Sequence, residues 1–251
     1  MIKDVLKKIV HSCGYDVRKR IPVSEYPSDF LEEDIEIIKK VKTFTLTSNE
    51  RINSLIQATK YIVQNDIPGD IIECGVWKGG SMMAIALKLL KEKNSEKDLY
   101  LFDTYEGMSK PTELDISFEG KNAEKQYEKN KRKEDSSDWC YVPLEEVKQN
   151  MIKTEYNSQK LHFIKGKVEN TIPEFAPKQI SLLRLDTDWY ESTKHELIHL
   201  YPRLSTGGVL IIDDYGYWKG AKKAVDEYFK KSKDKILLNR IDETGRISIK
   251  I

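Results

Sequence analysis

The sequence predicts an α/β fold built on a mostly parallel sheet with a helical cap at the N-terminus. From Asp70 onward, short apolar and β-branched runs alternate with segments of helical periodicity, which is the pattern of βα units. Only residues 242–245 separate the last two runs, too few for a crossover helix, so these runs are predicted to form an antiparallel hairpin. Five βα units and the hairpin together predict a seven-stranded sheet.

The predicted elements follow one another in a regular order. Apolar residues at helical spacing after the first strand predict a helix over 81–91. Two further helices, over 192–200 and 219–231, fit between later strands. The strands themselves are predicted over 70–74, 99–103, 161–165, 180–186, 209–213, 236–241 and 246–251.

Residues 1–69 and 104–160 lie outside this alternation. The first region is predicted to be a helical cap or oligomerisation segment, with one helix over 50–65, ahead of a main domain over 70–251. Apolar residues and lysines separate onto two faces of a helix expected over 1–10, which we expect to pack on its own domain rather than on a membrane surface or partner subunit. The second region is a lid-like insertion, and its charged stretch 119–135 is predicted to be a solvated helix.

Composition excludes several classes of protein. The 42 Lys and Arg against 41 Asp and Glu give a net charge of +1, so the chain lacks the basic field that nucleic-acid binding requires. Charges interrupt the N-terminal apolar run, and no apolar stretch approaches the ~18 residues of a membrane span, so neither a signal peptide nor a span is expected. Cys13, Cys74 and Cys140 are odd in number and far apart, which favours a reducing cytoplasm over a disulfide framework.

The turn after the first predicted strand has the features of a nucleotide-binding loop. Glycines at 75, 79 and 80 allow a tight turn and close approach of a ligand, and Ser81 begins a helix with free amides. The loop is neither a GxGxxG nor a phosphate-binding P-loop, which disfavours dinucleotides and nucleoside triphosphates. Glu73, just before the first glycine, could bind the amino group of an amino-acid ligand. This combination favours S-adenosylmethionine (SAM).

The second predicted strand ends in a carboxylate. Asp103 stands where an acidic residue can accept hydrogen bonds from both hydroxyls of a ribose. Its alternative role is to cap the turn that begins at Thr104. Together with the glycine-rich turn, Asp103 predicts a cofactor that contains adenosine.

Aspartates gather where two neighbouring strands are predicted to end. Asp186 follows the fourth strand, and Asp213 and Asp214 follow the fifth. The carboxyl ends of parallel strands meet at one edge, so these carboxylates would repel one another without a cation or protons. Oxygen ligands without Cys or His point to Mg²⁺, with manganese or calcium as substitutes. The alternative, carboxylates that cap helices and face water, applies best to Asp188 and less well to the Asp213–Asp214 pair.

One motif competes with this interpretation. Residues 195–199 read HELIH and match HExxH, the zinc-protease signature. His199 is the last histidine of the chain, so the third ligand would have to be a carboxylate such as Asp226 or Glu227. Apolar residues of the same helix need burial against the sheet. A coincidental match with surface histidines is therefore the favoured interpretation.

The glycine-rich loop, the acidic strand end and the aspartate cluster together resemble the macrocin O-methyltransferase family, which acts on sugars of macrolide and aminocoumarin antibiotics. The similarity spans roughly residues 43–230. It is carried by the stretches 45–51, 68–80, 103–108, 183–193 and 207–215. Some relatives place a histidine in the long insertion, but residues 104–160 contain none.

The resemblance implies a class I SAM-dependent methyltransferase with a Rossmann-like sheet, an acceptor hydroxyl on a natural-product, glycan or lipid-linked sugar, and a homo-oligomer. It implies magnesium bound by Asp186, Asp213 and Asp214, with Asp186 or Asp188 taking the hydroxyl proton. The cofactor contacts that it implies are Thr47, Glu73, Gly75, Gly79, Ser81, Asp103, Thr104, Gly166, Val168 and Glu169. A non-catalytic SAM- or nucleotide-binding module and a zinc hydrolase are the alternatives.

Overall fold

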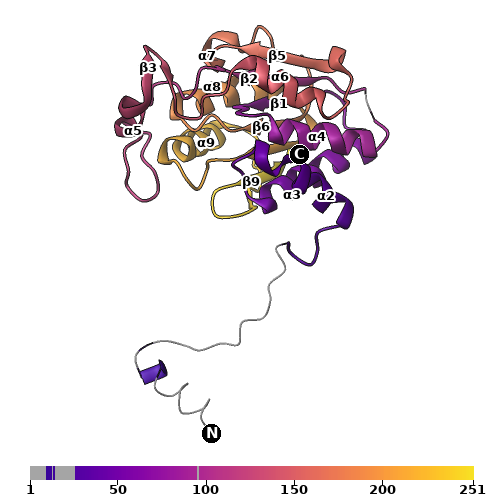
Figure 1. Cartoon of the computed structure of the whole chain (residues 1–251), viewed down its shortest axis with the longest axis horizontal. Helices are drawn as coiled ribbons and strands as arrows, with labels where there is room; N and C mark the ends of the chain where they lie inside the picture. Colours follow the sequence, from indigo (N-terminus) through magenta and orange to yellow (C-terminus); the bar gives the residue numbers. More distant parts are fainter. Residues whose placement is uncertain (1–9, 13, 15–25, 95) are drawn as a thin grey trace. The chain divides into compact units, whose positions relative to one another are not determined.

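The computed structural model describes residues 10–12, 14, 26–94 and 96–251 (Figure 1). The chain divides into two compact units, Met1–Leu31 and Glu32–Ile251, and the second contains every element considered below. The helix predicted over 1–10 falls, apart from Val10, outside the described residues, as does Cys13. None of the described helices combines the length and the apolar character needed to cross a membrane.

The predicted seven-stranded sheet is confirmed, with the strand order β5-β2-β1-β6-β7-β9-β8. The first five strands in this order pair in parallel, whereas β9 is antiparallel to both β7 and β8. The sheet is therefore mostly parallel, with an antiparallel hairpin at one end. The strands are β1 (Asp70–Cys74), β2 (Leu99–Asp103), β5 (Leu161–Lys165), β6 (Ile180–Leu185), β7 (Leu204–Ile212), β8 (Asn239–Arg240) and β9 (Arg246–Ile249).

Strands β7 and β8 differ most from their predicted bounds, while β6 and β9 end one and two residues earlier than predicted. Strand β7 begins earlier than predicted, because Leu204 already pairs with Ile180 of β6 and the ladder then continues past Gly207 and Gly208. Strand β8 is shorter than predicted, because only Asn239 and Arg240 pair with β9. Both differences arise from pairing between strands rather than from local propensity.

The predicted helices are also present. They are α3 (Asn49–Gln64), α4 (Gly80–Lys91), α8 (Tyr190–Leu200) and α9 (Lys219–Lys231), and α2 (Glu32–Val41) precedes them. Ser48 caps α3, because its hydroxyl accepts a hydrogen bond of 3.1 Å from the amide of Arg51. Helix α2 packs against α3 and α4, and α3 also contacts β6 and β7. Helices α2 and α3, which lie in the predicted cap region, therefore belong to the same compact unit as the sheet.

The sheet is buried on both faces, as its continuous apolar strands predict. One core cluster joins Ile72, Leu183 and Leu210 of the strands to Leu197 of α8 and Val225 of α9. Side chains along a strand alternate between faces, so their buried neighbours Ile71, Leu182 and Ile211 point toward the other side, where α3 lies. The carboxyl ends of the parallel strands are thereby held in fixed positions.

The insertion between β2 and β5 folds into short elements. It contains α5 (Ala123–Asn130), β3 (Lys131–Lys133), β4 (Ser136–Ser137) and α6 (Leu144–Ile152). The solvated helix predicted over 119–135 was wrong in its extent, because α5 stops at Asn130 and the next residues pair as a small antiparallel ladder. Closure of this insertion over a substrate stays a prediction.

A buried lysine ties α2 to α4. The Nζ atom of Lys88, whose side chain is fully buried, lies 2.9 Å from Glu33, 3.1 Å from Asp34 and 3.2 Å from Glu92. Burial alone would lower the pKa of Lys88, but hydrogen bonds to these carboxylates raise it to about 12. The side chain of Asp34 is equally buried, so the removal of either charge would leave the other one buried without a counter-charge.

We expect Lys88→Met to lower the free energy of unfolding by about 3–5 kcal/mol, because it leaves Asp34 buried without its counter-charge. The folded-state pKa of Lys88 lies above its ordinary value of 10.5, so the stabilisation is complete below that pH and is lost as pH rises through about 12. Urea denaturation at pH 7 measures the loss. The control is Lys91→Met, which removes an exposed pair with Glu36 and should change stability by under about 1 kcal/mol; equal effects would contradict the prediction.

Candidate active site

A cleft of about 500 Å³ opens at the carboxyl edge of the parallel strands. It is lined from the N-terminal region by Thr47 and Arg51, from the loop after β1, and from the ends of β6 and β7. A second cavity of about 70 Å³ adjoins it and shares Gly75, Asp103 and Asp186 with it. Open α/β sheets bind ligands at this edge, so the fold places the predicted site residues where a ligand can reach them.

The glycine-rich loop passes very close to neighbouring backbone. Gly75 has φ of 84°, and a Cβ at this position would collide with the carbonyl oxygen of Asp186. Gly79 caps α4 with φ of 89°, and a Cβ on Gly80 would collide with the carbonyl of Phe44. Only glycine fits these positions without strain. Ser81, one residue into α4, lines the cleft as predicted.

Glu73 presents an unpaired carboxylate oxygen beside the cleft. Its side chain is 1% exposed, and its Oε1 accepts a hydrogen bond of 2.5 Å from Nη1 of Arg184. Its Oε2 is buried and has no hydrogen-bond partner. Burial raises the pKa of Glu73 to about 7, although Arg184 opposes this shift. A buried acceptor without a donor is costly, so this oxygen is suited to receive an N–H group from a ligand.

Asp103 holds the loop after β1 to the end of β2. Its Oδ2 accepts from the amides of Val76 (2.7 Å) and Trp77 (3.2 Å), and its Oδ1 accepts from the amide of Tyr105 (2.7 Å). Burial raises its pKa, and these amides oppose the shift. Oδ2 already accepts from two amides, whereas Oδ1 accepts from one amide and retains a lone pair, so Asp103 can accept one hydrogen bond from a ribose while it also fixes the turn.

The smaller cavity collects predicted cofactor residues that lie far apart in sequence. Thr104 follows β2, Gly166 follows β5, and Val168 and Glu169 belong to the short helix α7 (Val168–Thr171). All of them line this cavity, whereas Thr47 lines the larger cleft. The structure thus brings nine of the ten predicted cofactor residues to the lining of these two cavities; the tenth, Gly79, lies next to Val147 and Met151 instead. Contacts of all ten with a cofactor stay a prediction.

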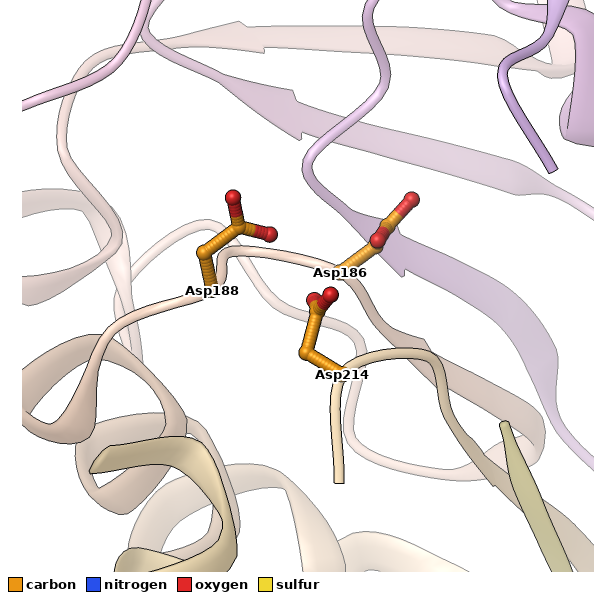
Figure 2. Close-up of side chains that lie close together, drawn as sticks. All are labelled: Asp186, Asp188 and Asp214. Atoms are coloured by element: carbon orange, nitrogen blue, oxygen red, sulfur yellow. The ribbon is translucent and has the colours of Figure 1, made fainter. Parts of the chain in front are cut away.

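Three aspartates that line the cleft lie close together (Figure 2). Ligand atoms of Asp186, Asp188 and Asp214 all lie within 4.8 Å of one another. Burial raises the pKa of Asp188 to about 7, and burial together with the neighbouring carboxylates raises those of Asp186 and Asp214 well above their ordinary value. The Oδ2 atom of Asp214 is buried without a hydrogen-bond partner. Carboxylates this close favour a cation among them.

Asp213 lies next to this group but faces two arginines. Its Oδ1 accepts a hydrogen bond of 2.5 Å from Nη2 of Arg184, and its Oδ2 accepts from Nη1 of Arg51. The sequence predicted Asp186, Asp213 and Asp214 as the metal ligands. In the structure, the three carboxylates that lie within reach of one ion are Asp186, Asp188 and Asp214, so Asp188 takes the place of Asp213. A carboxylate has about four lone-pair sites, so Asp213 retains two that the arginines do not use.

Two arginines that the sequence reasoning missed organise the acidic site. Arg184 is 3% exposed and contacts Glu73, Asp186 and Asp213 together. Arg51 of α3 joins Asp213 to Asp242 in the turn between β8 and β9, at 2.9 Å from Asp242. Arg184 had a signal in the sequence, since a charge within a strand of isoleucine and leucine requires a buried counter-charge. Arg51 had no such signal.

The HExxH residues do not form a metal centre. The Nε2 atom of His195 lies 2.9 Å from the carbonyl oxygen of Ile172. Glu196 of α8 is fully buried and accepts a hydrogen bond of 2.9 Å from the hydroxyl of Thr187. The imidazole rings of His195 and His199 lie beside each other at 4.4 Å. Across the described part of the chain, the aspartate group is the only set of three candidate ligands within reach of one ion. The zinc-hydrolase alternative therefore lacks a site.

Comparison with known proteins agrees with this geometry. The model of the macrocin O-methyltransferase (TylF) family matches residues 34–248. Demethyldecarbamoylnovobiocin O-methyltransferase of Streptomyces niveus is 29% identical over 184 residues, which cover 73% of this chain and 67% of that protein. Mycinamicin III 3''-O-methyltransferase of Micromonospora griseorubida is 28% identical over 228 residues, 90% of this chain and 86% of that protein.

Among solved structures, the O-methyltransferase NovP superposes with a TM-score of 0.69 at 27% identity, covering 82% of this chain and 81% of NovP. The chain belongs to the macrocin O-methyltransferase family and is an O-methyltransferase with the class I SAM-dependent fold.

Proposed function

We propose that this enzyme transfers a methyl group from SAM to a hydroxyl of a sugar moiety, on a natural product, a glycan or a lipid-linked acceptor, with the help of a divalent cation such as Mg²⁺. The observation that carries the proposal is one continuous cleft that holds both an amino-acid-type recognition loop and an aspartate cluster. The relatives named above are O-methyltransferases of novobiocin and mycinamicin precursors. Homo-oligomerisation and a cytoplasmic location stay predictions.

The cofactor half of the cleft fits SAM. The buried, unpaired Oε2 of Glu73 matches the ammonium of the methionine moiety, and Gly75, which packs on the backbone of Asp186, lines both cavities. Asp103 retains acceptor capacity for a ribose, and the cavity beside Gly166 and Val168 is lined by both backbone and apolar side chains. SAM would supply a methyl group activated by its sulfonium.

The aspartate group fits a hard cation. Asp186 and Asp214 belong both to the set predicted from sequence and to the set grouped by the structure, and Asp214 has a buried oxygen without a donor. The third carboxylate is Asp188 by proximity or Asp213 by sequence prediction, and the experiment that separates them is given in the Discussion. A bound Mg²⁺ would supply Lewis-acid chemistry by lowering the pKa of an acceptor hydroxyl.

The chain's own residues then have three tasks. Glu73 and the glycine-rich loop orient the cofactor, so that the reacting atoms are held in line rather than meeting by diffusion. Asp186 or Asp188 takes the proton from the acceptor hydroxyl, as general base. Arg184 forms ion pairs with Glu73, Asp186 and Asp213 and so fixes the positions of these carboxylates relative to one another. This network connects the cofactor half of the cleft to the acidic half.

Calorimetric titration tests the proposal. Wild-type protein should bind S-adenosylhomocysteine at micromolar concentration and show a separate Mg²⁺ signal that EDTA removes, and mass spectrometry should then detect methyl transfer to glycosides. Absence of S-adenosylhomocysteine binding both in MgCl₂ and in EDTA would overturn the SAM assignment.

The variant Glu73→Gln should weaken S-adenosylhomocysteine binding roughly 10- to 100-fold, because a charge-assisted hydrogen bond to the ammonium is lost. Calorimetry gives the affinity, and thermal unfolding verifies that the variant is folded. The control is Glu106→Gln, an exposed carboxylate paired with Lys165 on the surface, which should leave the affinity unchanged. Equal affinities for wild type and Glu73→Gln would remove Glu73 from the cofactor site.

A further inference from the structure

The turn that carries Asp188 is held in place by the insertion. Asp188 has a left-handed backbone with φ of 70°, a conformation that persists in a non-glycine residue when its surroundings enforce it. The amide of Tyr190 donates a hydrogen bond of 2.8 Å to Oδ1 of Asp115, and the indole Nε1 of Trp189 donates one of 3.1 Å to the carbonyl oxygen of Ser109. The N-cap residue of α8 offers no side-chain hydrogen bond of its own. Asp115, 75 positions earlier in the chain, therefore caps α8.

The same part of the insertion is bonded to the turn that follows Asp214. The amide of Lys219 donates a hydrogen bond of 2.9 Å to the carbonyl oxygen of Ile116. The amide of Phe118 donates one of 2.8 Å to the carbonyl oxygen of Tyr217, whose own amide donates at 3.0 Å to the carbonyl oxygen of Asp214. Hydrogen bonds from the insertion thereby join the turn after β6 to the turn after β7.

Asp115 lies where these contacts meet. Its side chain is fully buried, and its Oδ2 accepts hydrogen bonds from the amide (2.7 Å) and the hydroxyl (2.8 Å) of Thr112, which fix the orientation of the carboxylate. A Cβ on Gly220, the second residue of α9, would collide with Oδ1 of Asp115, so α9 begins directly against this carboxylate. One anion thus lies at the starts of α8 and α9, where the partial positive charge of a helix N-terminus stabilises it.

The spacing of the two turns determines whether the aspartates can share a cation. Asp188 and Asp214 lie beyond the last residues of β6 and β7, so the sheet ladder does not fix them. Asp186, by contrast, is paired with Arg184. Ligand atoms of the three aspartates lie within 4.8 Å of one another (Figure 2). Because Mg²⁺ demands near-ideal octahedral geometry, a displacement of either turn would weaken its binding.

We infer that residues 109–118, the clamp segment, set the spacing of the two turns that carry Asp188 and Asp214, and that Asp115 is the positioning residue of this segment. Asp115 lines neither cavity, so it acts through the two turns and not by touching a cofactor or an acceptor. The clamp segment is then a fixed support of the cation site rather than a moving part of a lid. This inference rests on the proposed function, because it concerns the cation that the function includes.

Calorimetry on the full-length protein tests the inference by comparing Mg²⁺ affinity with S-adenosylhomocysteine affinity. Asp115→Ala removes the cap of α8 and should weaken Mg²⁺ binding roughly tenfold or more, the usual cost of losing a residue that orients metal ligands, with the S-adenosylhomocysteine affinity within about twofold of wild type. Gly220→Ala tests the same residue without deleting it. The added methyl displaces Asp115, although alanine favours the helix more than glycine does, and should weaken Mg²⁺ binding by at least about threefold.

Two further variants separate positioning from a general loss of stability. Asp115→Asn keeps an oxygen for the amide of Tyr190 and caps a helix about as well as aspartate, but its NH₂ group faces the amide of Thr112. It should lower the thermal unfolding temperature while its Mg²⁺ affinity stays within about threefold of wild type. The matched control is Lys88→Met, which removes a buried charge away from the cleft and should leave Mg²⁺ affinity unchanged.

The outcomes distinguish this inference from the proposed function. Mg²⁺ affinity equal to that of wild type in both Asp115→Ala and Gly220→Ala would overturn the inference and leave the proposed function standing. A parallel loss of Mg²⁺ and S-adenosylhomocysteine affinity, or an equal loss of Mg²⁺ affinity in Lys88→Met, would also overturn it, because the effect would then reflect a loosened fold. Absence of a Mg²⁺ signal in wild type would instead contradict the proposed cation, and the inference with it.

Discussion

Replacing Arg184 with methionine is expected to lower the free energy of unfolding by about 3–5 kcal/mol, because removing one partner of a buried ionic network leaves the other charges uncompensated. Arg184 lies at the end of β6 with Glu73 on one neighbouring strand and Asp213 at the end of the other. Both carboxylates are nearly fully buried. Methionine has a similar volume to arginine, so the decrease in the free energy of unfolding would reflect the lost charge and not a new cavity.

Urea denaturation in EDTA measures this loss without contributions from a cation. The control is Arg132→Met, since Arg132 is 40% exposed and its pair with Asp138 lies on the surface, where such pairs contribute about 0–1 kcal/mol. The double variant Arg184→Met with Glu73→Gln should recover part of the stability, because one of the stranded charges is then neutral. A loss of less than about 1 kcal/mol in the single variant would show that the network is not held by Arg184.

The elements of the sheet were predictable because local and tertiary signals agree. Strands β1, β2 and β5 match their predicted bounds, since each is a short apolar run flanked by charged or turn residues. The convergence of Asp186 and Asp214 follows from topology alone, because adjacent parallel strands end at one edge. The sequence alone therefore predicts that these two carboxylates lie close together at one edge of the sheet.

The remaining features depend on contacts that sequence does not encode locally. Arg51 and Asp213 are 162 positions apart, and nothing near either residue indicates that they pair. The left-handed backbone of Asp188, with φ of 70°, places this side chain beside Asp186 and Asp214 although its sequence position suits a helix cap. The ladder of β3 and β4 is short and polar, so it leaves no periodic apolar pattern. The sequence therefore left undetermined both the side-chain partners in the site and the short polar strands of the insertion.

The second large effect is expected for Asp214→Asn, which should abolish the Mg²⁺ signal in calorimetry and lower kcat roughly 10²- to 10³-fold, as loss of a preorganised electrostatic stabiliser does. Asp214 belongs to both candidate ligand sets, and its buried Oδ2 has no other partner. Asparagine keeps the shape and removes the charge, so S-adenosylhomocysteine binding should persist. The control is Asp226→Asn, whose carboxylate pairs on the surface with Lys222. Retained Mg²⁺ binding in Asp214→Asn would remove this residue from the cation site.

The same titration on Asp188→Asn and Asp213→Asn identifies the third ligand. Loss of the Mg²⁺ signal in Asp188→Asn alone assigns the ligand to Asp188 and leaves Asp213 as the anchor of Arg51 and Arg184. Loss in Asp213→Asn alone assigns it to Asp213, and Asp188 is then free to take the proton. In that case Asp188→Asn should bind Mg²⁺ and S-adenosylhomocysteine normally yet lose about 10²-fold or more in kcat, the usual contribution of a general base. Normal turnover in Asp188→Asn would leave Asp186 as the base.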